Sequence, residues 1–224
     1  MIGATGAFHF TPRIASHMEP LVTLATDSPG ATALLALIVI ASLIGLFAAP
    51  AMVERNLFRP HWLLPRREYS TLFTSAFLHA DLAHLFFNGF TFWAFAFSLE
   101  RAMGTTSFLA LFFFGLLVSD LGTWLTHRHD AGYKCLGASG AILTVLFASI
   151  VYNPSGSIFI LPIPVPIPAP LFAVLYMAYS YYASRQARGR VNHDAHLAGA
   201  VAGIVFVALA DFPTLERAVH ALFS

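Results

Sequence analysis

Long runs of apolar residues recur along the chain and are separated by shorter stretches that carry most of its charges. A membrane-spanning helix needs about 20 apolar residues, and fewer suffice where one end is buried inside the protein. Six stretches meet this requirement, at residues 32–53, 81–98, 107–125, 139–151, 171–184 and 195–210. The pattern therefore predicts an all-α membrane protein with a bundle of six transmembrane helices.

A different pattern separates the fourth stretch from the fifth. Between Leu161 and Pro170 a proline occupies every second position. Because proline lacks a backbone N–H and fixes φ, this segment cannot continue a helix, and we predict an extended, polyproline-like connector along the membrane. Recognition of the prolines by a partner, as in PxxP ligands, is the alternative, and the apolar residues between the prolines argue against it.

Composition supports membrane insertion and restricts the classes of function. Apolar residues make up 58% of the chain and charged residues 10%, against roughly 25% charged residues in an ordinary soluble domain. A net charge of +1 leaves no basic face for nucleic acid, and the single Cys135 excludes an internal disulfide. The first thirty residues lack the pattern of a cleaved signal peptide. We expect an N-terminal tail at 1–30, one helical domain at 31–212 and a C-terminal tail at 213–224.

Four polar residues lie close to the start of even-numbered predicted helices. His84 and Asn88 are one turn apart in the second helix, Ser139 begins the fourth, and His196 lies near the start of the sixth. In a serpentine bundle these helices start from the same side of the membrane, so the four side chains should lie at a similar depth. Polar groups at membrane depth are costly and usually face a protein interior or a wet cavity. We therefore expect the four to face one another.

Small residues beside Ser139 and His196 predict a close contact between the fourth and sixth helices. Gly199 and Gly203 follow His196 by three and seven residues, and Gly140 follows Ser139 directly. Stripes of small residues let transmembrane helices approach closely. Packing at these glycines is expected to bring the serine to the histidine.

This arrangement predicts nucleophilic catalysis. A serine hydroxyl becomes an effective nucleophile when a neighbouring base takes its proton, and the neutral imidazole of His196 can do so near pH 7. The oxyanion of the tetrahedral intermediate then needs hydrogen-bond donors. The candidates are the Ser139 backbone N–H, the Asn88 amide and the His84 ring, and the start of a helix favours negative charge as well.

Three motifs lie in these helices. Residues 137–140 read Gly-Ala-Ser-Gly, residues 79–88 hold two histidines and an asparagine, and residues 195–203 read AHLAGAVAG. They resemble the GxSG nucleophile motif, the second-helix motif and the sixth-helix AHxxGxxxG pattern of the rhomboid family of intramembrane serine proteases. Each motif is weak alone, whereas together they are specific. The resemblance covers nearly all of the chain after the N-terminal tail.

The resemblance implies Ser139 as the nucleophile and His196 as the base, with His84, Asn88 and the Ser139 N–H in the oxyanion hole. It implies helix-packing roles for the glycines, namely Gly137, Gly140, Gly199 and Gly203. The implied fold is a bacterial-type six-helix rhomboid bundle with a water-filled cavity, which cleaves transmembrane segments near helix-destabilising, small residues. Transmembrane protein substrates and the lipid bilayer are the expected partners. We expect a multi-pass location in the cell (inner) membrane and no cofactor.

Several residues stand outside this scheme. Many relatives carry a tyrosine four residues after the serine that packs on the base, and this chain has Leu143, so the imidazole is expected to be oriented by other contacts. We interpret Glu100 with Arg101 as a structural pair by resemblance, and His79 as a loop anchor. Asp120 is expected to be hydrogen-bonded near the membrane edge, with substrate gating as the alternative. Cys135 is expected to be a buried thiol.

Two other classes of function are open on the sequence alone. Imidazole clusters bind zinc, copper, iron or nickel. Six histidines fall toward one side of the membrane, namely His79, His84, His127, His129, His193 and His196. Against metal binding, carboxylates are nearly absent from the spans and no HExxH spacing occurs. The other alternative is a catalytically silent relative that binds transmembrane clients, although such proteins lack the serine or the histidine.

The orientation of the bundle is predicted differently by two lines of inference. Nine of the twelve basic residues lie in the loops on the side of Ser139, namely Arg55, Arg59, Arg66, Arg67, Arg128, Lys134, Arg185, Arg188 and Arg190. The other side holds Arg13, Arg101 and Arg217. The positive-inside rule places the nine in the cytoplasm. The family resemblance instead implies an active site that opens outward. We predict the outward orientation, although the count of basic residues predicts the opposite one.

Overall fold

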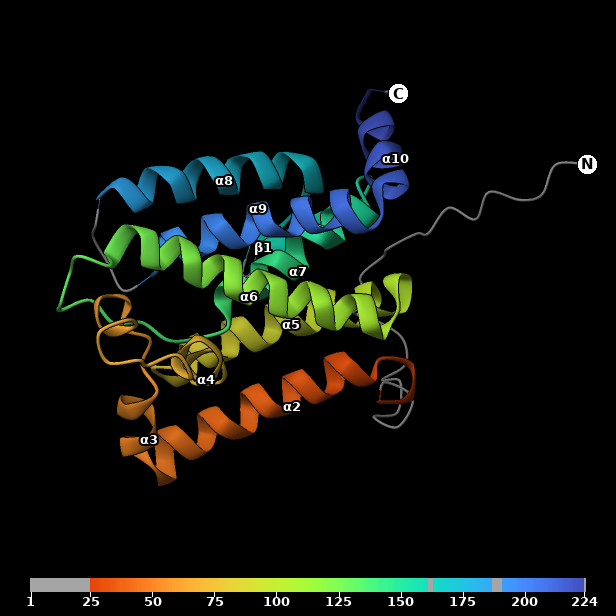
Figure 1. Cartoon of the computed structure of the whole chain (residues 1–224). Helices are drawn as coiled ribbons and strands as arrows, with labels where there is room; N and C mark the ends of the chain where they lie inside the picture. The colour runs from red at the N-terminus through yellow and green to blue at the C-terminus, as the bar shows by residue number, and fades with distance from the viewer. Residues whose placement is uncertain (1–24, 161–162, 187–190, 224) are drawn as a thin grey trace, which may run out of the picture.

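The computed structural model describes residues 25–160, 163–186 and 191–223, and it is mostly helical (Figure 1). A helix lies over each of the six stretches named above. These are α2 (Pro29–Leu43), α5 (Leu82–Met103), α6 (Thr105–His127), α7 (Ser139–Tyr152), α8 (Ala169–Gln186) and α9 (His193–Ala210). Most of the predicted N-terminal tail, residues 1–24, lies outside the described residues, and α2 begins within the last two residues of that tail.

Within the described residues, four helical segments are long and apolar enough to cross a membrane. They are Pro29–Ala48, Leu82–Met103, Thr105–His127 and His193–Ala210. Helix α7 is apolar but has only 14 residues. It lies in the middle of the bundle, so its backbone ends are covered by protein rather than by lipid, and a full span is not needed. Helix α8 has 18 residues and is more polar than the four spanning segments. Four of its 18 residues are tyrosines.

The first predicted segment is not one continuous helix. Helix α2 passes into a π turn (Ile44–Ala48), and a separate helix α3 (Pro50–Arg55) follows. Proline is tolerated in the first turn of a helix but clashes with the preceding turn inside one, so Pro50 starts a new helix. The chain then forms the 3₁₀ turns η2 (Pro60–Trp62) and η3 (Ser75–Phe77) around the short helix α4 (Thr71–Thr74). The expectation of one helix up to residue 53 was therefore wrong.

The proline-rich connector is extended, as predicted, but it is half of a β-hairpin. Strand β1 (Ser157–Ile160) pairs antiparallel with β2 (Ile163–Pro168), with Ile158 opposite Ile167. Alternate residues of a strand point their backbone groups in opposite directions, so prolines at every second position leave the other residues free to pair. An isolated polyproline conformation was the wrong expectation. Leu161 and Pro162 lie outside the described residues.

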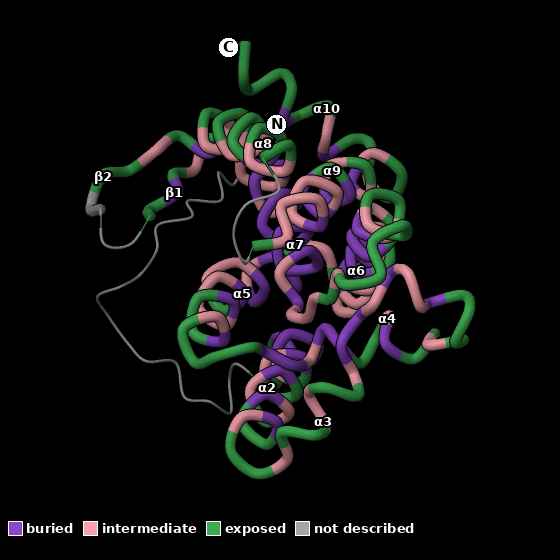
Figure 2. The backbone as a smooth tube through the Cα atoms, turned by 90° about the vertical axis from the view of Figure 1, so that its left-hand side faces the viewer, coloured by how far each residue is buried: buried purple, intermediate pink, exposed green. Residues whose placement is uncertain are grey.

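Helix α7 is the centre of the bundle, and Figure 2 shows it surrounded by α5, α6, α8 and α9. All of its residues from Gly140 to Ala148 are buried. A side chain on Gly199 of α9 would overlap the carbonyl group of Gly140, and one on Gly203 would overlap the Thr144 carbonyl oxygen. The Thr144 hydroxyl donates to the carbonyl oxygens of Gly199 at 2.9 Å and of Gly140 at 3.1 Å. Glycines therefore allow α7 and α9 to touch backbone to backbone.

Helices α5, α7 and α9 begin at the same end of the bundle, on the left in Figure 1. The loops at this end are joined to one another. Phe58 and Cys135 exchange two backbone hydrogen bonds of 2.9 and 3.0 Å, and the Gly137 N–H donates to the Ser75 carbonyl oxygen at 3.0 Å. The polar residues predicted to face one another thus come from helix starts that these loops hold together.

The buried carboxylate of Glu100 binds the start of α2, at the end of the bundle away from Ser139. The Glu100 side chain is 1% exposed and accepts hydrogen bonds from the backbone N–H groups of Gly30 at 2.9 Å and Ala31 at 2.6 Å, and from the Thr105 hydroxyl at 2.8 Å. The first N–H groups of a helix have no partners within the helix, and the helix start favours negative charge. Glu100 therefore caps α2 and ties it to the end of α5.

The predicted C-terminal tail is a helix. Helix α10 (Phe212–Phe223) follows α9 after a single residue, Asp211. The Asp211 carboxylate accepts hydrogen bonds from the Tyr152 hydroxyl of α7 at 2.9 Å and from the Thr214 hydroxyl at 2.6 Å. These bonds hold the junction of α9 and α10 against the end of α7.

Candidate active site

Ser139 is the first residue of α7 and is half-buried. The chain reaches it through Gly137, whose φ of +111° lies in the region that side chains disfavour. A Cβ atom on Gly137 would lie 2.8 Å from Cε1 and 2.9 Å from Nε2 of His84. Glycine is thus required here both by backbone conformation and by the imidazole packed against it.

The start of α5 delivers the two candidate oxyanion donors. The Asp81 carboxylate accepts a 2.7 Å hydrogen bond from the His84 N–H and so caps the helix. Asn88 follows one turn later, is 9% exposed, and places its Nδ2 3.7 Å from the Cβ position of Gly137. His84 and Asn88 therefore gather over the peptide that leads into Ser139.

His79 connects this pair to α2. Its ring is fully buried, with Nε2 2.8 Å from Asn88 Nδ2 and Nδ1 2.8 Å from the Ser42 hydroxyl oxygen. The Ser42 hydroxyl also donates to the Phe77 carbonyl oxygen at 3.1 Å. Burial lowers the pKa of His79 to about 3, and the neighbouring His84 acts in the same direction. The neutral ring can accept a hydrogen bond from the Asn88 amide and donate one to Ser42, which fixes the amide in place.

The start of α9 carries the candidate base. Asn192 caps this helix by accepting a 3.0 Å hydrogen bond from the Ala195 N–H, and its amide nitrogen donates to the Thr123 hydroxyl of α6 at 2.8 Å. A Cβ atom on Gly140 would lie 3.2 Å from the Ala195 carbonyl oxygen. Gly140 follows Ser139 and Ala195 precedes His196, so this contact brings the serine and the histidine to adjoining positions.

No hydrogen bond joins Ser139 to His196, both of which are described residues. Catalytic hydrogen bonds are often long or poorly aligned in free enzymes and tighten in the substrate complex, so the chemistry depends on the two residues being neighbours. A serine at a helix start, a nearby imidazole and a pair of donors on the other flank are the groups that acyl transfer requires.

One residue next to the candidate base was not predicted from the sequence. The hydroxyl oxygen of Tyr176, on α8, lies 3.0 Å from Nδ1 of His196. Leu143 stands where many relatives have a tyrosine, and this departure was the available signal for another contact at the imidazole. Four tyrosines in α8 were candidates, and the rotation of α8 about its axis selects Tyr176.

The remaining residues singled out by the sequence lie around the site. Asp120 is 9% exposed, and its Oδ2 has no hydrogen-bond partner among the described residues, so the expected hydrogen bond is not formed by this oxygen. Cys135 accepts a 3.6 Å hydrogen bond from Asn192, and burial raises the pKa of its thiol to about 12, which keeps it protonated.

Five of these six histidines lie in pairs or against other partners. The rings of His79 and His84 lie 4.7 Å apart between centroids, and those of His193 and His196 lie 5.9 Å apart. His127 Nε2 is 3.0 Å from the Asp194 carboxylate, and its ring stacks on Tyr133. In the described parts of the chain, no three His, Cys, Asp or Glu side chains are grouped so as to hold a metal ion.

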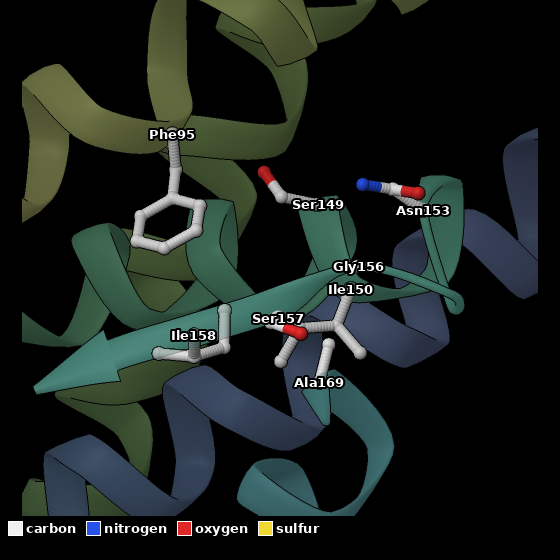
Figure 3. Close-up of a pocket in the computed structure, with 8 residues that line it drawn as sticks. All are labelled: Phe95, Ser149, Ile150, Asn153, Gly156, Ser157, Ile158 and Ala169. Carbon is white, nitrogen blue, oxygen red and sulfur yellow. The ribbon is translucent and has the colours of Figure 1, made fainter. Parts of the chain in front are cut away.

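A small pocket lies at the other end of α7 from Ser139. It has a volume of about 20 Å³, enough for about one water molecule. Figure 3 shows Phe95 of α5 above Ile158 of β1 at the left, with Ser149 of α7 and Asn153, which follows α7, further to the right. None of its lining residues belongs to the three motifs, so we do not associate it with catalysis.

A family model described as the rhomboid domain matches residues 66–210, well over half of the chain. Rhomboid protein 1, mitochondrial, of Saccharomyces cerevisiae is 26% identical over 212 residues, which cover 90% of this chain and 59% of the relative. The human presenilin-associated rhomboid-like protein, mitochondrial, is 29% identical over 148 residues, covering 62% of this chain and 37% of the relative. The putative rhomboid protease YdcA of Bacillus subtilis is 39% identical over 75 residues, covering 34% of this chain and 37% of the relative.

The chain spans less than two thirds of the length of each of these relatives. They come from mitochondria and from a bacterium, so the comparison supports the family rather than the bacterial type expected from the motifs. The matched range contains the start of α5, the start of α7 and the start of α9, which together build the site described above. The chain is therefore a membrane protein that belongs to the rhomboid family, whose proteases are serine intramembrane peptidases.

Proposed function

We propose that this protein is an intramembrane serine endopeptidase that cleaves transmembrane segments of other membrane proteins. Ser139 is the nucleophile and His196 is the base. One observation carries the proposal: the start of α7 lies against the start of α9, where the Cβ position of Gly140 is 3.2 Å from the Ala195 carbonyl oxygen. Ser139 precedes Gly140 and His196 follows Ala195, and His84 and Asn88 lie on the other flank of the serine.

In the first step, the Ser139 hydroxyl proton passes to Nε2 of His196 as Oγ attacks the carbonyl carbon of the scissile peptide bond. The π pair of that carbonyl moves onto its oxygen, which becomes the oxyanion. Collapse of the intermediate breaks the C–N bond, and the imidazolium gives its proton to the leaving nitrogen. Water, deprotonated by the same imidazole, then hydrolyses the acyl-enzyme.

The oxyanion is bound by the Ser139 backbone N–H, the Asn88 amide and the His84 ring. Asn88 is suited to this role because one of its two amide hydrogens is used by His79, and the other is left for the substrate. His79 acts here as a positioning residue. Removing one oxyanion donor typically costs about 10²–10³ in kcat, so Asn88→Ala is expected to lower kcat by about that factor with little change in KM.

The full domain in this proposal is a bundle of six transmembrane helices. Four segments have the length and hydropathy of spans. Helices α7 and α8 complete the bundle because they pack against α9 and against each other. The domain covers residues 31–212, except that its first helix begins at Pro29, and the terminal segments are 1–30 and 213–224, the second of which forms most of α10. The protein is multi-pass in the cell (inner) membrane. Its partners are transmembrane substrates and lipid, it does not bind nucleic acid, and it needs no metal or other cofactor.

The proposal is tested by cleavage of a model transmembrane substrate by the purified protein in liposomes. We expect cleavage by the wild type, none by Ser139→Ala or His196→Ala, and no effect of a metal chelator. Ser149→Ala is the matched control, because Ser149 lies on the same helix and only donates to the Val145 carbonyl oxygen at 2.9 Å. It should cleave like the wild type.

Two results would contradict the proposal. Cleavage that persists in Ser139→Ala would assign the activity to another residue. A wild type that binds a transmembrane substrate but cleaves none of a panel with small residues in its membrane segment would favour the catalytically silent client-binding role.

A further inference from the structure

The contact of Tyr176 with His196 is specific in its geometry. The hydroxyl oxygen lies 3.0 Å from Nδ1, and the two rings are nearly parallel, with 26° between their planes and 6.5 Å between their centroids. Both residues are half-buried, Tyr176 on α8 and His196 in the first turn of α9. The tyrosine therefore contacts Nδ1 of the imidazole and leaves the other ring nitrogen, Nε2, for a different partner.

Tyr176 is itself held in place from two helices. Its ring stacks on Phe172, one turn earlier on α8, with centroids 5.6 Å apart and 28° between the planes. Its ring also packs against Phe147 of α7, with 5.9 Å between the ring centroids. Leu143, at the position where many relatives have a tyrosine, is 7% exposed and belongs to the same apolar cluster. Tyr176 of α8 thus lies against the imidazole, whereas position 143 of α7 holds a leucine.

We propose that Tyr176 is the positioning residue of the base, which accepts a hydrogen bond from Nδ1–H of His196 and so leaves the lone pair of Nε2 directed toward Ser139. This inference rests on the proposed function, because it assigns the orientation of the base in that mechanism. It names a residue outside the three motifs.

The direction of this hydrogen bond follows from what the base must do. A neutral imidazole carries one N–H, and only the ring with its hydrogen on Nδ1 has an Nε2 that can take the serine proton. A tyrosine oxygen accepts from Nδ1–H in this form and continues to accept after proton transfer, when both nitrogens carry hydrogen. Tyr176 gains and loses no proton in the cycle.

A purely structural role for Tyr176 makes different predictions. If only the ring matters, Tyr176→Phe should behave as the wild type, since phenylalanine keeps the stacking on Phe172. If the hydroxyl orients the base, Tyr176→Phe should lose activity while it keeps its stability. Tyr176→Leu removes both the ring and the hydroxyl and should lose stability as well. Tyr182→Phe is the matched control, because it removes a hydroxyl from the same helix at a position that is 66% exposed.

The first test measures cleavage of the model transmembrane substrate in liposomes. We expect Tyr176→Phe to lower kcat about tenfold, which corresponds to one hydrogen bond of about 1.4 kcal/mol, with KM and thermal unfolding close to those of the wild type. Tyr182→Phe should not differ from the wild type. Wild-type kcat in Tyr176→Phe, measured under conditions where Ser139→Ala is inactive, would overturn the inference and leave the proposed function intact.

The second test does not depend on cleavage. Proton–nitrogen correlation spectra of protein with ¹⁵N-labelled histidine report which ring nitrogen carries hydrogen, and the signals of His196 are assigned by their loss in His196→Ala. We expect the Nδ1–H form in the wild type and in Tyr182→Phe, and a mixture of the two forms in Tyr176→Phe. An Nε2–H form in the wild type would overturn the inference, whatever the activity.

Discussion

Substitution of Gly199 by alanine tests the close contact that brings the two proposed catalytic residues together. The new Cβ atom would overlap the Gly140 carbonyl oxygen and would lie 2.8 Å from its carbonyl carbon and 3.1 Å from its Cα. All three are backbone atoms of α7, so no side-chain rotation can relieve the clash. Since carbon atoms pack best at about 3.5–4.0 Å, we expect α9 to move away from α7 by roughly one ångström.

The structure sets the size of two effects. Overpacking a well-packed core typically costs about 1–3 kcal/mol. We expect the upper end, about 3 kcal/mol, because the obstacle is backbone and the hydrogen bond from Thr144 to the Gly199 carbonyl oxygen is stretched as well. A misplacement of about one ångström in a catalytic site can cost about 10² in rate. Gly199→Ala should therefore lose stability and, in the fraction that remains folded, most of its activity.

Gly89→Ala provides the control for this experiment. Gly89 lies inside α5, and the nearest atom to an added Cβ is Leu35 Cδ1 at 3.9 Å, an ordinary contact. Alanine is favoured over glycine inside a helix by about 0.5–1 kcal/mol, so this variant should be as stable as the wild type or more stable. Both variants are compared by thermal unfolding in detergent and by cleavage in liposomes. Wild-type stability and activity in Gly199→Ala would refute the packing on which the site depends.

Three further predictions address the frame around the site. Replacing Glu100 by alanine leaves the N–H groups of Gly30 and Ala31 without their acceptor, which should cost about 1–3 kcal/mol of stability for each group. Glu100→Gln keeps one acceptor oxygen and should lose less stability. Equal thermal stability of both variants and the wild type would contradict the capping role. Burial lowers the pKa of His79 from 6.5 to about 3, so the unfolded chain binds more protons between these values, and the free energy of unfolding should fall by about 1.4 kcal/mol for each pH unit below 6.5. This slope, measured by unfolding between pH 7 and 4.5, should be smaller in His79→Gln. Alkaline phosphatase fused to the C-terminus should be inactive if the active site opens outward, and periplasmic activity would instead support the positive-inside count.

The sequence predicted those features that depend on neighbouring residues along the chain. Long apolar runs mark helices wherever they pack, and the motif spacing placed His84 and Asn88 on one helix face. The start of α7 at Ser139 also coincides with the predicted start of the fourth helix. Such features require no knowledge of the partner that each helix finds.

What the sequence missed depends on contacts between distant segments. The strand formed by the prolines needs β1 as its partner, and the choice of Tyr176 among the tyrosines of α8 needs the rotation of that helix against α9. Helix α10 is different, because its signal was present. Leu215, Val219 and Leu222 lie at helical spacing, and this amphipathic pattern in the segment interpreted as a tail is typical of a helix.

Of the charges on the side of Ser139, several have structural partners. Arg59 lies 3.1 Å from Glu54 and 3.8 Å from Glu68, and Lys134 lies 3.4 Å from Glu54. The Lys134 pair connects the segment before α5 to the loop before α7, and both Arg59 pairs lie within the segment before α5. Arg188 and Arg190, like Arg13 on the other side, lie outside the described residues. Arg59 and Lys134 thus contribute to the structure of their own loops, and the orientation of the bundle stays a prediction.

Covalent trapping of the nucleophile tests directly whether His196 activates Ser139. The purified wild type is treated with a fluorophosphonate probe, which reacts with serines activated by a base, and the modified residue is located by mass spectrometry. We expect a single label on Ser139, which is lost in Ser139→Ala and in His196→Ala and retained in Ser149→Ala. A label on another residue, equal labelling of Ser139 in His196→Ala, or an unlabelled Ser139 in the folded wild type would contradict this expectation.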